Sequence, residues 1–77
     1  GSPLEEILKI QRRINKIQDD INKILHEILR MQEKLNRSSD KDEVEESLRR
    51  IRELIKRIKD LSKEIEDLSR EVKYRTT

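Results

Sequence analysis

Large aliphatic residues recur every three or four positions through the first half of the chain. The series runs Ile7, Ile10, Ile14, Ile17, Ile21, Ile24, Ile28, Met31 and Leu35. This alternating spacing corresponds to positions a and d of a heptad repeat, which is typical of a helix packed along another helix. The pattern therefore predicts one long amphipathic helix.

A second stripe lies beside the first, at heptad positions b and e, and mixes leucine with amide side chains. It reads Leu4, Leu8, Gln11, Asn15, Gln18, Asn22, Leu25 and Leu29. Positions d, a, e and b together cover an arc of about 155° around a helix. Because one antiparallel partner helix covers a narrower seam, this face predicts packing against more than one neighbour.

The second half of the chain carries a repeat of its own. It runs Val44, Leu48, Ile51, Ile55, Ile58, Ser62, Ile65, Ser69 and Val72, with Ser47, Leu54, Leu61 and Leu68 flanking it at position g. Acidic and basic residues four apart are expected to pair on the exposed face: Glu45–Arg49, Glu46–Arg50, Glu53–Arg57 and Glu66–Arg70. Each such pair stabilises a helix by only ~0.2–0.5 kcal/mol, so this face is interpreted as a solvated surface.

Cap and turn residues set the expected boundaries. Ser2 suits an N-cap, with Pro3 at the first helical position and Glu5 completing a capping box. The only internal cluster of turn residues spans positions 36–40, where Ser39 or Asp40 is expected to cap the second helix.

These signals predict an all-α fold and a single domain over residues 1–77. A helix over about residues 3–36, a loop over 37–40 and a helix over about 41–74 form an antiparallel helix–loop–helix hairpin, because so short a loop keeps the helices adjacent. The heptad spacing predicts assembly of such hairpins into a left-handed coiled-coil bundle. Residues 1–2, Gly-Ser, are interpreted as the scar of a removed expression tag.

The composition excludes several classes of protein. Basic and acidic residues nearly balance, at 19 against 17, and no basic patch typical of nucleic-acid binders is found. Apolar runs never exceed two residues, so neither a membrane span nor a targeting signal is expected. Absence of cysteine removes disulfides and thiolate metal sites. We expect a soluble protein that would be cytoplasmic if expressed in a cell.

No catalytic constellation is found. His26 is the only histidine and lies at position f, whereas a metal site in a bundle needs Glu-x-x-His motifs or a second histidine. Ser47, Ser62 and Ser69 have no convincing base with an orienting acid. The only glycine is residue 1, so no phosphate-binding loop is present. The chain is therefore predicted not to be an enzyme and to use no metal, cofactor or small-molecule substrate.

The amide block is the most informative group. If the loop is centred near residue 38, residues whose numbers sum to about 77 lie level across the hairpin, which places Asn15 level with Ser62. A buried amide without a partner costs ~1–3 kcal/mol, so buried amides must satisfy one another. We expect a hydrogen-bond network in an oligomer interface, formed by Gln11, Asn15, Gln18, Asn22, Ser62 and Ser69. The alternatives are a solvated rim or a site for a ligand or ion.

The partner is expected to be a further copy of the chain. A single hairpin leaves much of the broad apolar face exposed. A C2 dimer, forming a four-helix bundle, is the first expectation because such dimers are the commonest closed assembly. A trimer is the rival, since isoleucine at both a and d favours higher-order coiled coils.

The chain resembles computationally designed helical-hairpin homo-oligomers with buried hydrogen-bond networks. The resemblance rests on leucine and isoleucine layers around Gln11–Asn22, serines at heptad spacing and the capped loop 37–40, and it covers the whole chain. It implies a synthetic protein made to assemble in one defined way, without a biological substrate. Designs of this class include heterodimers, so a different partner chain is possible. The competing interpretation is a natural coiled-coil tethering or adaptor module that binds a partner helix.

Overall fold

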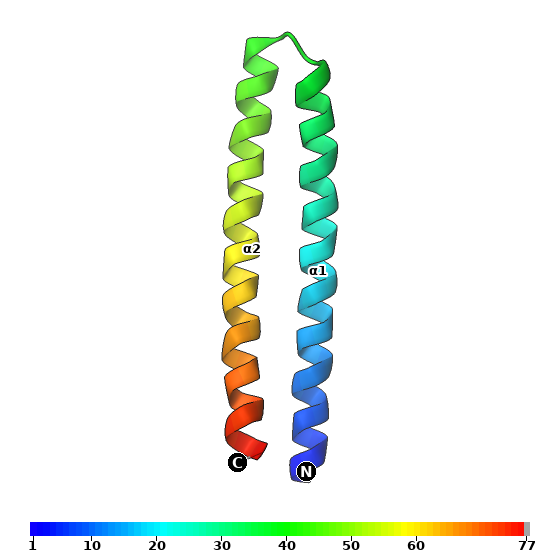
Figure 1. Cartoon of the computed structure of the whole chain (residues 1–77), viewed down its shortest axis with the longest axis vertical. Coiled ribbons are helices and arrows are strands. Elements are labelled where there is room, and N and C mark those ends of the chain that lie inside the picture. Colours follow the sequence, from blue (N-terminus) through cyan, green and yellow to red (C-terminus); the bar gives the residue numbers. More distant parts are fainter. Residues whose placement is uncertain (77) are drawn as a thin grey trace.

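The computed structural model describes residues 1–76 as a hairpin of two long helices (Figure 1). Helix α1 spans Pro3–Arg37 and helix α2 spans Lys41–Thr76, slightly beyond the predicted ends. The molecule measures 57 × 15 × 14 Å, and both termini lie at the end opposite the loop. The predicted all-α fold and antiparallel hairpin are confirmed; only the last position of the predicted domain, residue 77, lies outside the described residues.

Both ends of α1 are closed by serine. The Ser2 hydroxyl accepts a hydrogen bond from the backbone N–H of Glu5 at 3.2 Å, and Pro3 occupies the first turn. At the other end Ser38 leaves the helix in an extended conformation, with φ −93° and ψ 137°, while its N–H donates to the carbonyl oxygen of Leu35 at 3.3 Å. Because the described backbone has no residue with positive φ, this turn needs no glycine.

Helix α2 is capped by Asp40 rather than by Ser39. The Asp40 carboxylate accepts from the backbone N–H groups of Asp42 at 2.9 Å and Glu43 at 3.4 Å. The hydroxyl of Ser38 in turn accepts from the N–H of Asp40 at 3.2 Å and fixes the cap in place. Side chains of the loop thus satisfy N–H groups that the first turn of a helix leaves without partners.

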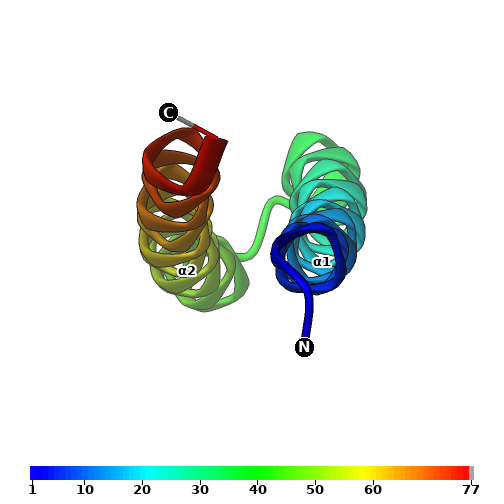
Figure 2. The ribbon, with the colours of Figure 1, turned by 90° about the horizontal axis from the view of Figure 1, so that it is seen from below.

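The core is a single seam between the two helices, which lie side by side in end-on view (Figure 2). On α1 the predicted seam residues Ile10, Ile14, Ile17 and Ile28 are buried, and Ile7, Ile21, Ile24, Met31 and Leu35 are half-buried. Ile17 is the most enclosed, with no exposed surface. The prediction that positions a and d of the first helix pack against the second is therefore confirmed.

Helix α2 presents a different pair of heptad positions to this seam. The residues that face α1 are the buried Ser47, Ile51, Leu54 and Leu61, together with the half-buried Val44, Ile58, Ile65, Leu68 and Val72. These are positions d and g. Position a, occupied by Leu48, Ile55, Ser62 and Ser69, is exposed. The single repeat predicted for the second helix is thus split between two faces of the hairpin.

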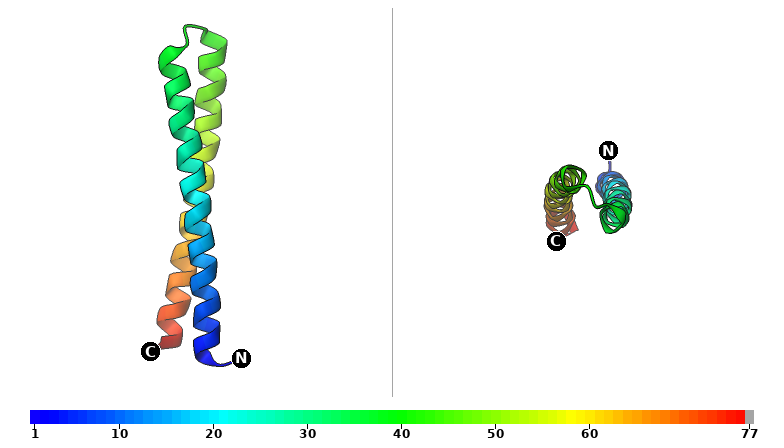
Figure 3. Two further views of the ribbon diagram at one scale, coloured as in Figure 1. Left: turned by 90° about the vertical axis from the view of Figure 1, so that its right-hand side faces the viewer. Right: turned by 90° about the horizontal axis from the view of Figure 1, so that it is seen from above.

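Three ion pairs join the helices and define their register. They are Arg13–Glu64 at 2.7 Å, Glu27–Arg50 at 3.4 Å and Lys34–Glu43 at 3.8 Å. In each pair the two residue numbers add up to 77. The helices stay adjacent from the loop to the termini and cross gently in the side view (Figure 3). The register predicted from the position of the loop is therefore confirmed.

Several ion pairs on the surface of α2 join residues three positions apart. They are Arg49–Glu46, Arg50–Glu53 and Arg70–Asp67. The four predicted Glu–Arg pairs with a spacing of four do not form among the described residues, so that prediction is wrong in detail. The guanidinium of Arg50 shows the reason, because it lies between Glu53 of its own helix and Glu27 of α1.

Candidate functional site

A stripe of exposed residues runs along α1 beside the seam and contains the whole predicted amide block. It consists of Leu4, Leu8, Gln11, Asn15, Gln18, Asn22, Leu25 and Leu29. Leu4 is 65% exposed and Leu29 57%, although monomeric proteins rarely expose large apolar patches to water. Within the single hairpin, none of the four amides is buried.

The exposed positions a of α2, Leu48, Ile55, Ser62 and Ser69, lie on the same side of the hairpin as this stripe. The interhelical ion pairs use position g of α1 and position c of α2, so these positions border one edge of the seam. The positions bordering the opposite edge are then e of α1 and a of α2. We call the twelve residues of both helices the outer stripe, and the edge with the three ion pairs the ion-pair edge.

The register of the hairpin divides the outer stripe into zones. Leu48 lies level with Leu29 near the loop, so this end is apolar on both helices. Near the middle, Ser62 lies level with Asn15, as the sequence predicted. On α1 the outer stripe is therefore a polar block between leucine ends, whereas on α2 the apolar Leu48 and Ile55 lie toward the loop and Ser62 and Ser69 toward the termini.

One hydrogen bond links the amides within the chain. The Gln11 amide nitrogen donates to the side-chain oxygen of Asn15 at 3.2 Å. The side chains of Gln18, Asn22, Ser62 and Ser69 make no hydrogen bond within residues 1–76. Their donors and acceptors are accessible to solvent, and no buried side-chain nitrogen or oxygen among the described residues lacks a partner. The block thus holds unused polar groups on its exposed surface.

Ser47 is the one buried polar residue of the described seam, with 6% of its surface exposed. The sequence identifies Ser47 as a flanking residue at position g, together with Leu54, Leu61 and Leu68, and does not by itself predict its burial. A usable signal was present, because position g of the second helix holds three leucines where position a holds two serines. The more apolar edge is the one that packs against α1.

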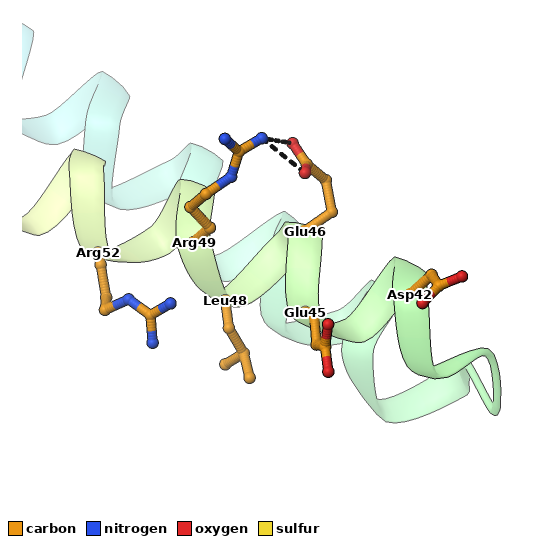
Figure 4. Close-up of a pocket in the computed structure, with 6 residues that line it drawn as sticks. All are labelled: Asp42, Glu45, Glu46, Leu48, Arg49 and Arg52. Carbon is orange, nitrogen blue, oxygen red and sulfur yellow. Dashed lines mark hydrogen bonds and ion pairs between the residues drawn. The ribbon is translucent and has the colours of Figure 1, made fainter.

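A shallow surface hollow borders the apolar end of the outer stripe (Figure 4). It is lined by Asp42, Glu45, Glu46, Leu48, Arg49 and Arg52, all from α2. Leu48 projects between Glu45 and Arg52, away from the hydrogen-bonded Arg49–Glu46 pair. That hydrogen bond raises the pKa of the Arg49 guanidinium. A hollow on a single helix is too open to enclose a ligand. Its charged side chains flank the outer stripe at this end.

Metal-binding and membrane-spanning features were the remaining candidates among residues 1–76. His26 is exposed, and the described residues contain no group of three His, Asp or Glu side chains placed to hold a metal ion. Neither described helix combines the length and apolar content needed to cross a membrane.

Comparison of the chain with protein-family models, with curated proteins and with solved structures finds no match.

Proposed function

We propose that this chain is a designed self-assembling protein whose hairpins associate through the outer stripe into one symmetric helical bundle. The observation that carries the proposal is the row of exposed leucines interrupted by amides, on the side of the hairpin opposite the ion-pair edge. A designed origin is supported by the sequence, because it lacks alanine and builds both helices from regular leucine and isoleucine layers.

The exposed apolar surface supplies a driving force for association. Six large apolar side chains of the outer stripe are between 41% and 65% exposed. Full burial of a leucine or isoleucine contributes ~1.5–3 kcal/mol, so covering the exposed half contributes roughly 1 kcal/mol for each. The sum over two or more copies is comparable with the entropic cost of association.

The amides add specificity to this attraction. Asparagine and glutamine each carry a donor and an acceptor, which allows a closed network to repeat by symmetry. In a slipped register an amide would face leucine and lose its hydrogen bonds, at a cost of ~1–3 kcal/mol for each buried group. We propose that the network comprises Gln11, Asn15, Gln18 and Asn22 with the hydroxyls of Ser62 and Ser69.

A dimer of hairpins is the assembly proposed first, and a trimer is the second candidate. In a dimer each helix packs against two neighbours in a four-helix bundle. The trimer is favoured by the breadth of the apolar face of α1, which suits an inner helix in contact with several others.

Sedimentation equilibrium over a dilution series tests the proposal. We expect one discrete species whose mass is a small multiple of 9.3 kDa. Leu29→Glu should weaken this assembly, whereas Arg30→Glu, at a neighbouring exposed position, should leave it unchanged. A folded monomer at micromolar concentration would refute the proposal, and binding of an added amphipathic peptide by that monomer would instead support an adaptor module.

A further inference from the structure

We infer that neighbouring hairpins in the assembly point in the same direction, with α1 of one copy packed beside α2 of the next and with ion pairs along their contact. This inference rests on the proposed function, because it names the orientation of the copy that covers the outer stripe. It requires a symmetry axis parallel to the helices, an arrangement that is available to both a dimer and a trimer.

The ion-pair edge shows how this chain uses charges beside a helix–helix seam. Position g of α1 and position c of α2 border the seam, and three pairs of opposite charge form across it at matching levels. Charged residues that border a seam thus favour one register between antiparallel helices. The outer stripe has bordering charges of its own on the opposite side of the hairpin.

Two series of polar residues border the outer stripe. On α1, position f holds Glu5, Arg12, Asp19, His26 and Glu33, here called the α1 flank. On α2, position e holds Glu45, Arg52, Lys59, Glu66 and Lys73, here called the α2 flank. Glu45 and Arg52 are seen on either side of Leu48 in Figure 4.

No side chain of either flank takes part in an ion pair within residues 1–76. The α1 flank points away from α2, because position f is opposite the d/a seam on the helix surface. It therefore has no access to the α2 flank of its own chain. A neighbouring copy seated on the outer stripe in the same direction brings its own α2 flank beside this α1 flank.

The charges of the two flanks are complementary when the copies point in the same direction. The same residue then lies at the same height in every copy. Residues of α1 in one copy and of α2 in the next are therefore level when their numbers add up to about 77, as within the hairpin. In the half of the hairpin between its middle and the termini, this register brings three pairs of opposite charge to the same level: Glu5 with Lys73, Arg12 with Glu66, and Asp19 with Lys59. Each pair lies within one residue of the register set by the ion-pair edge.

The loop half of the flanks does not share this complementarity. There His26 stands level with Arg52, and Glu33 stands level with Glu45. The proposed ion pairs therefore belong to the half of the assembly that contains the amide block, while contact at the loop end is carried by leucines such as Leu48 and Leu29.

A copy pointing in the opposite direction meets a different partner helix. When one hairpin is turned face to face onto another in that direction, α1 lies over α1 and α2 over α2, so the α1 flank borders the α1 flank of the neighbour. Arg12 and Glu66 of neighbouring copies are then separated both across the bundle and along it. Proximity of Arg12 to Glu66 consequently distinguishes the two orientations.

Disulfide cross-linking tests the orientation directly, because the chain has no cysteine of its own. We compare Arg12→Cys/Glu66→Cys with Arg12→Cys/Arg52→Cys, which places the second thiol on the same face of α2 about 21 Å away. A disulfide needs Cα atoms within about 7 Å, so a disulfide within one hairpin is excluded in both variants. On oxidation only the first variant should yield covalent oligomers in high yield.

The outcomes separate the inference from the proposed function. Sedimentation of the reduced variants reports whether an oligomer forms at all, and a monomer refutes the proposed function together with the inference. An oligomer that cross-links through Arg12→Cys/Arg52→Cys, or through neither variant, overturns the orientation and leaves the proposed function standing. Circular dichroism of the reduced variants checks that both remain helical.

A charge reversal provides the second measurement and needs no new thiol. Arg12→Glu should raise the dissociation constant of the oligomer by roughly three- to tenfold, because an attraction in each interface becomes a repulsion. Adding Glu66→Arg should return the dissociation constant to its original value, and this recovery reports the coupling of the two residues. The control Lys23→Glu, at an exposed position outside both flanks, should leave the dissociation constant unchanged. Failure of Glu66→Arg to restore association would contradict the pairing.

Discussion

Arg13 of α1 and Glu64 of α2, 51 residues apart in the sequence, are joined by two hydrogen bonds to one carboxylate oxygen. The guanidinium donates through Nε at 3.2 Å and through Nη2 at 2.7 Å. Two donors on a planar group fix the relative height of the helices more closely than a single ammonium contact can. This pair thus marks the register that places Asn15 level with Ser62.

Reversal of one charge in this pair should destabilise the hairpin slightly. Arg13 and Glu64 are about half exposed, so screening by water limits the loss from Arg13→Glu to ~0.2–1 kcal/mol. Arg13→Glu/Glu64→Arg should recover that loss. Urea denaturation at low and high salt measures both effects, with Lys23→Glu as a control at an exposed position without an ion pair. Equal stability of the single and double variants would show that the contact contributes nothing.

The cap of α2 is expected to contribute more than any surface ion pair. Asp40→Ala removes the acceptor for the backbone N–H groups of Asp42 and Glu43, which should cost ~0.5–2 kcal/mol. Ser39→Ala is the matched control, since its side chain makes no hydrogen bond within the described residues. Thermal and chemical denaturation compare the two variants. A larger loss from Ser39→Ala would contradict the assignment of the cap.

Local signals were enough to predict the hairpin, because heptad spacing, Ser2 and the 36–40 turn act within a few residues of one another. The register also followed, since a short loop fixes which levels face each other. The face of α2 that packs against α1 does not follow from the spacing, because both its a/d and its d/g positions have apolar residues at helical spacing. Charge pairing with α1 and the leucines at position g decide between them, and these are effects between helices.

Two truncations of apolar residues should differ in kind. Ile17→Ala removes a side chain with no exposed surface and should cost ~2–5 kcal/mol at any protein concentration. Leu29 is 57% exposed in the hairpin. Leu29→Ala should therefore lower the stability of the protein mainly at concentrations at which it is assembled. Denaturation curves at several concentrations distinguish the two. A concentration-independent loss for Leu29→Ala as large as that for Ile17→Ala would mean that the outer stripe is not an interface.

The last prediction concerns the amides of the outer stripe. Gln11, Asn15, Gln18 and Asn22 share heptad positions b and e with the leucines at both ends, so apolar residues fit the same surface. Replacing all four with leucine removes the desolvation of the amides and adds apolar area, so the free energy of unfolding should be kept or raised. The uniqueness of the assembly should suffer, because an all-aliphatic stripe accepts several registers and copy numbers.

A single replacement should act in the opposite sense. Asn15→Leu removes the acceptor for the Gln11 amide and leaves polar partners unpaired in the interface, which should cost ~1–3 kcal/mol for each subunit. Native mass spectrometry reports the number of species, and chemical denaturation reports stability. Lys16→Leu, at the adjacent exposed position, is the control for added apolar surface. If the fourfold variant stays a single species of the original mass and Asn15→Leu is neutral, the amides lie at a solvated rim and do not set the specificity of assembly.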